Sequence, residues 1–175
     1  TLTLTGTLTA NDNINALASF LSGGTIDLNG ARTWTVENTA DVDDDLTVST
    51  SIINTVASTF TKNGTGRLVL TVGNTFADIF AIADGIVRIT HADALGTTAG
   101  GTTVNSGDAL EISGGITVAG ESLLLNGTGP STTGALRNVI GINAWTGTID
   151  LAGDARINAD AGTQLTVSAI TAGGT

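Results

Sequence analysis

A five-residue segment occurs twice, unchanged, near the two ends of this chain. Gly24–Leu28 recurs as Gly147–Leu151, with the letters GTIDL in both copies. Similar residues follow each copy, so that residues 24–52 are related to residues 147–170. Self-similarity of this kind is the sequence signature of repeat architectures. We therefore expect residues 1–175 to be a single segment built from imperfect repeats, and part of a longer chain.

Short segments in which apolar and polar residues alternate lie along the chain. Examples are Thr25–Leu28, Arg67–Leu70 and Ala109–Ile112. This alternation predicts strands with one buried face. The composition agrees, because 32 Thr favour strands and 24 Gly favour the turns between them, while Pro occurs once.

Two architectures fit short strands with frequent turns. Asn-Gly pairs such as Asn29-Gly30 would suit the hairpins of an antiparallel sandwich. The repeat and the 3% aromatic content favour an all-β, right-handed parallel β-helix, a solenoid of roughly seven or eight rungs at roughly 20–25 residues each. Short helical turns at Asn13–Leu21 and Phe76–Ile82 are the alternative for those two segments, and a helix at the first would cover an open end of the solenoid.

The charge and the missing cysteines exclude several classes of function. A net charge of −10 argues against nucleic acid and anionic membrane surfaces as partners, because both attract positive charge. Without cysteine the chain has neither disulfides nor thiolate metal sites. No stretch reaches the roughly 18 apolar residues of a membrane-spanning helix, so no membrane insertion of this segment is expected. No cofactor is expected either.

One stretch carries a recognisable motif. Lys62-Asn63-Gly64-Thr65-Gly66-Arg67-Leu68-Val69-Leu70, followed by Asn74-Thr75-Phe76, resembles the autotransporter-associated β-strand repeat. The later Thr102-Thr103-Val104-Asn105-Ser106-Gly107, leading to Leu110, is similar to the strand pair that completes the family pattern. After Phe76 the chain departs from the usual Gly-Gly-Thr turn, so a wider corner is expected there.

The resemblance implies a right-handed parallel β-helix within a large bacterial protein. Such proteins are secreted, extracellular or displayed on the outer-membrane surface, often as autotransporter passengers. The repeat marks a scaffold and supplies no catalytic residue for transfer to this chain.

An acidic run is the densest group of candidate metal ligands. Asp41, Asp43, Asp44 and Asp45 supply the oxygen atoms that Ca²⁺ prefers. The related unit has Asp160 but no comparable cluster, and the run lacks the glycine spacing of a calcium loop. We interpret it as a solvated acidic turn.

Little suggests enzymatic chemistry. Polysaccharide cleavage needs paired carboxylates at a defined separation, or Ca²⁺ with a basic residue. His91 lacks an evident partner, and the arginines are scattered along the chain (Arg32, Arg67, Arg88, Arg137 and Arg156). Trp34 and Trp145 could contact glycans as stacking platforms, although packing in the interior explains them better. We expect no enzyme activity.

A stripe of threonines opens the chain at residues 1, 3, 5, 7 and 9. Such a stripe could bind ice if threonines stood at the same place on successive rungs, but Asp27, Arg88, Glu111 and Asp150 stand at the comparable alternate positions. The sequence thus favours a structural rod of a surface protein, as a stalk, an adhesin passenger segment or an extracellular fibre subunit. A module that binds glycans or a host surface is the alternative. Uncapped ends would allow end-to-end self-association into filaments.

Overall fold

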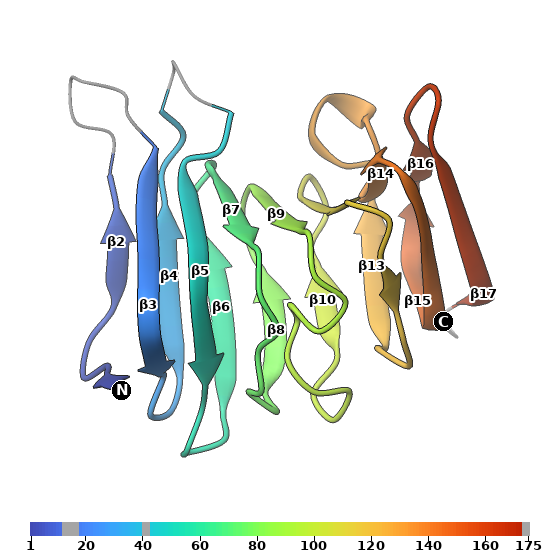
Figure 1. The fold of residues 1–175 in the computed structure, drawn as a ribbon. Coiled ribbons are helices and arrows are strands. Elements are labelled where there is room, and N and C mark those ends of the chain that lie inside the picture. Colours follow the sequence, from blue (N-terminus) through green and yellow to red (C-terminus); the bar gives the residue numbers. More distant parts are fainter. Residues whose placement is uncertain (12–17, 40–42, 173–175) are drawn as a thin grey trace.

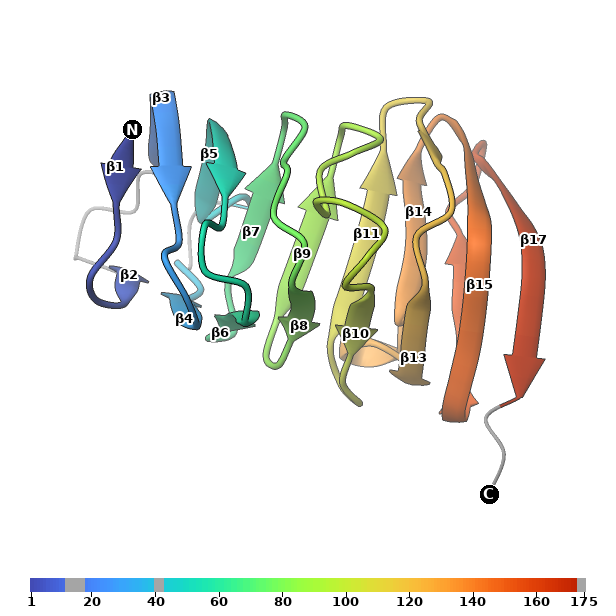
Figure 2. The ribbon, with the colours of Figure 1, turned by 90° about the horizontal axis from the view of Figure 1, so that it is seen from below.

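The computed structural model describes residues 1–11, 18–39 and 43–172, and it is an all-β parallel solenoid of about seven turns. Figures 1 and 2 show the turns stacked along one axis from the N-terminal to the C-terminal end. The parallel β-helix expected from the sequence is confirmed. The strands are β1 (Leu2–Thr3), β2 (Leu8–Ala10), β3 (Ser19–Asp27), β4 (Arg32–Val36), β5 (Leu46–Ile53), β6 (Thr59–Asn63), β7 (Arg67–Leu70), β8 (Ile79–Ile82), β9 (Ile86–Ile89), β10 (Thr102–Val104), β11 (Ala109–Ser113), β12 (Thr117–Val118), β13 (Leu123–Gly127), β14 (Leu136–Ile140), β15 (Ile142–Ala155), β16 (Ile157–Ala159) and β17 (Gln164–Ala172).

The strands form two sheets in which each strand pairs with a strand about one turn away. The first sheet has the order β1-β3-β5-β7-β9-β11-β14-β16. The second sheet has the order β12-β15-β13-β10-β8-β6-β4-β2, with β17 also paired to β15. Residues one turn apart therefore stack in columns along the axis. This stacking decides which side chains meet.

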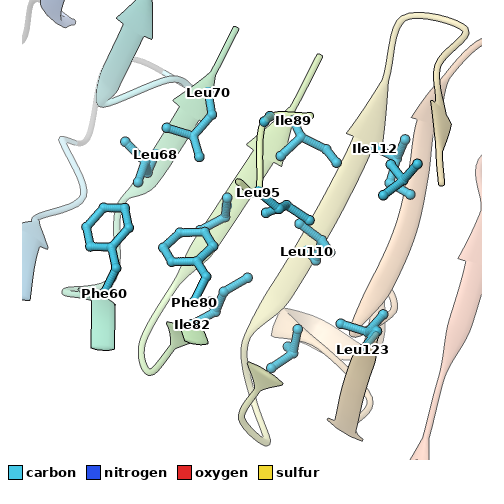
Figure 3. Packing of buried hydrophobic residues seen from close by; sticks show 14 of the residues in the cluster. Phe60, Leu68, Leu70, Phe80, Ile82, Ile89, Leu95, Leu110, Ile112 and Leu123 are labelled. Carbon is cyan, nitrogen blue, oxygen red and sulfur yellow. The ribbon is translucent and has the colours of Figure 1, made fainter. Parts of the chain in front are cut away.

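Apolar residues occupy the inward columns. In the first sheet one such column runs through Leu46, Leu68, Val87, Leu110 and Leu136, and all five side chains are buried. Figure 3 shows the same interior from close by. The alternation of the sequence thus places every second side chain inside, as a strand with one buried face requires.

Aromatic rings fill one level of this interior. Phe60 of β6 and Phe80 of β8 are paired in register, and their rings stack with centroids 4.7 Å apart. Phe76 and Trp34 meet Phe60 edge to face, with centroids 5.5 and 4.9 Å away. Such contacts add about 0.5–1.5 kcal/mol per pair beyond the apolar area that they bury.

The helical turns considered for two segments are wrong where the structure describes them. Ser19–Leu21 belong to strand β3, and residues 12–17 lie outside the described residues. Within Phe76–Ile82, strand β8 begins at Ile79 and alternates between exposed and buried side chains. This segment forms a strand because Phe80 and Ile82 pair in register with residues of the neighbouring turns and stack with them in the inward columns.

The corner after Phe76 is organised by a buried aspartate. Asp78 accepts hydrogen bonds from the backbone N–H of Ser58 and from the side-chain amide of Asn54. Both donors lie on the preceding turn. The residues that replace the usual glycine turn therefore fasten this corner to its neighbour.

The two related units lie in different sheets. Thr25–Asp27 of the first copy pair within the first sheet, through β3. Thr148–Leu151 of the second copy belong to β15 and pair within the second sheet. The first copy ends its strand at Asp27, whereas the second continues in β15 to Ala155, so the same five residues lie at two different positions around the solenoid.

Candidate functional site

A cluster of six charged side chains lies on the outer surface of the first sheet. The register of β7, β9, β11, β14 and β16 places Val69, Arg88, Glu111, Arg137 and Asn158 in one outward column. Three arginines that are scattered in the sequence gather here around one carboxylate, which corrects the expectation of isolated basic residues. We call the group formed by Asp44, Arg67, Arg88, Glu111, Arg137 and Asp160 the arginine cluster.

Glu111 is the centre of the arginine cluster. Its carboxylate accepts hydrogen bonds from Arg88 Nε at 2.9 Å and from Arg137 at 3.2 Å. Arg67 Nε lies 3.2 Å from the same carboxylate, without the alignment of a hydrogen bond. Although Glu111 points outward from the sheet, its side chain is only 1% exposed, because the three guanidinium groups cover it.

Two further carboxylates close the arginine cluster at its ends. Asp44 lies 3.0 Å from Arg88 and 3.5 Å from Arg67. Asp160 accepts two hydrogen bonds from Arg137, at 2.9 and 2.7 Å, and they raise the pKa of that guanidinium. Three positive and three negative charges thus balance. The arrangement links successive turns, and both oxygens of Glu111 are already occupied by the protein's own arginines.

The acidic run is more structured than a solvated turn. Asp41 lies outside the described residues. Asp43 is exposed, and its backbone carbonyl accepts a hydrogen bond from Arg67. Asp45 is buried and accepts hydrogen bonds from the backbone and hydroxyl of Thr39, and from the backbone N–H of Arg67.

These contacts correct the interpretation of the run as merely solvated, because Asp45 fastens one turn to the next. In the described part of the chain, no three His, Asp or Glu side chains come together as a possible metal-binding group. His91 lies on the surface, where its Nδ1 accepts a hydrogen bond from the backbone of Asp93.

Both tryptophans lie in the interior. Trp34 and Trp145 are 0% exposed, and both belong to the apolar core. Their ring faces are therefore covered by the protein, and neither ring is a stacking platform for glycans. The packing interpretation of these residues is the one that the structure supports.

Sequence reasoning missed the role of the chain's one lysine. Lys62 occupies an inward position of β6, level with Trp34 and Ile82, and is completely buried. Its ammonium donates hydrogen bonds to the backbone carbonyls of Gly64, Gly66 and Asp84. Burial lowers the pKa of Lys62 to about 8, against the attraction of Asp84 and Asp108.

The same contacts give the Lys-x-Gly-x-Gly motif a physical basis. Gly64 has a φ of +80°, and a side chain there would meet the backbone of Val36. The lysine folds back over the turn that the glycines allow, and its ammonium donates to the Gly64 and Gly66 carbonyls within that turn; the Gly66 carbonyl also accepts the backbone N–H of Ile86. The spacing of lysine and glycines was the available signal for this arrangement.

The asparagine of the motif links three turns. Asn74 is buried; its carbonyl accepts a hydrogen bond from Ile52 N–H at 2.8 Å, and its amide donates to the Ala94 carbonyl at 2.6 Å. Ile52 lies one turn before and Ala94 one turn after. Leu68 and Leu70 point into the core, as the motif implies.

The threonine stripe does not continue along the axis. Thr3 is followed in its column by Asp27, and Thr9 by Thr35. A comparable column runs through Thr33 and Thr61, but Ala81 interrupts it before Thr103, and Leu124 and Asp150 follow. In these columns no more than two threonines stack in succession, whereas ice binding requires a regular hydroxyl array.

The chain matches no protein-family model, no curated protein and no solved structure. Among the described residues, no helix has the length and apolar character to cross a membrane.

Proposed function

We propose that this chain is a structural rod within an exported bacterial surface protein, serving as a stalk, an adhesin passenger segment or an extracellular fibre subunit. The arginine cluster is the observation that carries the proposal. The charged side chains of this cluster are engaged in linking turns of the solenoid to one another, and both oxygens of Glu111 contact arginines.

The links follow the axis of the rod. Ion pairs join Asp44 to Arg88, Arg88 to Glu111, Glu111 to Arg137, and Arg137 to Asp160. With strands about 4.8 Å apart, seven turns give a rod of roughly 35 Å. A set of polar links along the axis and a largely apolar interior suit a part that holds other parts at a fixed distance.

The likeness to the autotransporter-associated repeat supports placement on a cell surface. The motif residues Lys62, Gly64, Leu68 and Asn74 each make a contact that a parallel solenoid needs. The absence of cysteine is compatible with this placement, because the apolar core and the ion pairs hold the solenoid together without disulfides.

The outermost described strands are suited to pair with further β-structure, either more turns of the same rod or another copy. These strands (β1, β2, β16 and β17) contain neither a charged residue nor a proline. Natural proteins commonly protect exposed edges with lysine or proline, which hinder pairing with another chain. Half-buried apolar residues, including Leu8 and Val167, lie at these ends.

Negative-stain electron microscopy, with light scattering on the same sample, tests the proposal. Uniform fibres support a fibre subunit, and a Val167→Lys variant should then shorten them, while Thr61→Lys in the central strand β6 should not. Separate short rods support a stalk segment. Compact particles without an elongated shape, or hydrolysis of a polysaccharide by the purified chain, would refute the structural role.

A further inference from the structure

A hollow of about 380 Å³ lies on the outer surface of the second sheet. It crosses β8, β10, β13, β15 and β17, which lie side by side in Figure 1. One outward column runs through it, from Thr103 to Leu124, Asp150 and Thr171. The hollow is thus built by several successive turns, away from the arginine cluster on the first sheet.

Two glycines, Gly100 and Gly101, belong to the lining of the hollow, together with Ile79 and Leu124. A side chain on Gly100 would collide with the backbone of Asp78, and one on Gly101 with Ser122. Ile79 and Leu124 are 46% and 41% exposed, so both offer apolar surface in the lining of the hollow.

The lining combines these apolar side chains with hydroxyl groups and one charge. Thr103, Ser122, Thr148 and Thr171 contribute hydroxyls, and Asp150 contributes a carboxylate. Asp150 accepts a hydrogen bond from Thr171 at 3.2 Å and keeps further acceptor capacity. A volume of 380 Å³ falls within the range of about 300–1,000 Å³ that small-molecule sites occupy.

The position of the hollow argues against an extended peptide as its occupant. A peptide that joins a sheet pairs with the free backbone of an edge strand. Here β10, β13 and β15 are each already paired on both sides, so side chains supply most of the recognition, and only β17 at one end of the hollow has a free edge. Hydroxyls, one acceptor carboxylate and two aliphatic side chains complement a ligand that has many hydroxyls and apolar C–H faces.

We propose that this hollow binds a short neutral saccharide. Leu124 and Ile79 would contact the C–H faces of the sugar rings, and Asp150 would accept hydrogen bonds from their hydroxyls. The net charge of −10 and the carboxylate in the hollow disfavour acidic polysaccharides. The proposal is independent of the rod's structural role, since a rod without this site would remain a rod.

Amide chemical shifts of the ¹⁵N-labelled chain, titrated with cellotriose, chitotriose and tri-galacturonate, test the proposal. A neutral trisaccharide should shift the amides of Gly101, Thr103 and Leu124. Thr103→Arg fills the hollow and should weaken binding about tenfold or more, a loss of about 1.4 kcal/mol. Thr61→Arg is the matched control, because Thr61 lies two strands away in the same outward column and should leave binding unchanged.

Several outcomes would overturn the proposal. One is the absence of shifts at these amides with either neutral sugar at millimolar concentration. Equal effects of Thr103→Arg and Thr61→Arg would show that binding occurs elsewhere. Stronger shifts with tri-galacturonate, or an extended peptide that shifts the same amides more strongly than the sugars, would assign the hollow to a different ligand.

Discussion

Replacing Glu111 with glutamine tests whether the arginine cluster stabilises the solenoid. Glutamine keeps the shape of the side chain and removes its charge, and it turns an NH₂ group toward guanidinium groups that can only donate hydrogen bonds. The carboxylate is 1% exposed and faces Arg67, Arg88 and Arg137. The variant should therefore leave three positive charges close together, with one compensating partner removed.

The expected loss lies between two known limits. Removing one partner of a fully buried ion pair costs about 3–5 kcal/mol, whereas an exposed pair contributes about 0–1 kcal/mol. Glu111 is buried, but the arginine side chains are 15–27% exposed and therefore partly screened by water. Asp44 and Asp160 also remain as partners. We expect Glu111→Gln to lower the free energy of unfolding by about 2–4 kcal/mol.

Urea unfolding, followed by circular dichroism at low and high salt, measures this loss. Asp44→Asn is the matched control: Asp44 faces two of the same arginines, but it is 40% exposed and should cost about 1 kcal/mol or less. Salt should narrow the gap between wild type and Glu111→Gln, because it screens the repulsion among the arginines. A Glu111→Gln loss no larger than that of Asp44→Asn would refute the argument that burial makes this carboxylate important.

Three further predictions concern the backbone, the core and a buried carboxyl. Gly64→Ala should lower the free energy of unfolding by well over 1 kcal/mol, because the new Cβ would lie 2.5 Å from the Val36 carbonyl oxygen and the backbone φ of +80° is itself strained for alanine. Gly23→Ala is the control: its φ is +77° but its surroundings are open, so it should cost only about 1 kcal/mol. Equal melting temperatures of the two variants would contradict this prediction. Phe80→Ala should cost about 3–5 kcal/mol in urea unfolding and Ile79→Ala under 1 kcal/mol, because only Phe80 is buried. Burial raises the pKa of Glu121 above the ordinary 4.5, so the contribution of Glu121 to the free energy of unfolding is fully present below that value and is lost as the pH rises through the raised pKa. Glu121→Gln should therefore be more stable than the wild type at neutral pH. Parallel curves of stability against pH for the two proteins would contradict this.

The sequence was sufficient to predict the parallel solenoid. Alternation in segments such as Arg67–Leu70 indicates which side chains point inward, and the repeat indicates that strands succeed one another along an axis. The helical turn at Ser19–Leu21 was a wrong alternative, because Leu21 joins β3 and pairs in register with Val48 of β5. A local pattern of nine residues does not reveal that distant partner.

The arginine cluster was hidden for a related reason. Arg88 and Glu111 are 23 residues apart, Glu111 and Arg137 are 26 apart, and Arg137 and Asp160 are 23 apart. Each separation is about one turn, but the turns differ in length. The charges can be placed in one column only when the lengths of the intervening loops are known.

Buried polar groups set the register of this solenoid, because apolar columns alone would allow several registers between neighbouring turns. Leu, Ile and Val stack against one another in many registers, and the segment GTIDL lies in either sheet. A polar group is more demanding, because leaving it buried without a partner costs about 1–3 kcal/mol. Asn74 meets both its partners only when three turns are correctly aligned, and Asn138 likewise reaches Gln164 on the following turn. A slip by one residue would also turn apolar side chains outward. Burial of the apolar columns therefore drives the turns to stack on one another. The hydrogen bonds of the buried asparagines, Lys62 and Asp45 determine the register in which they stack.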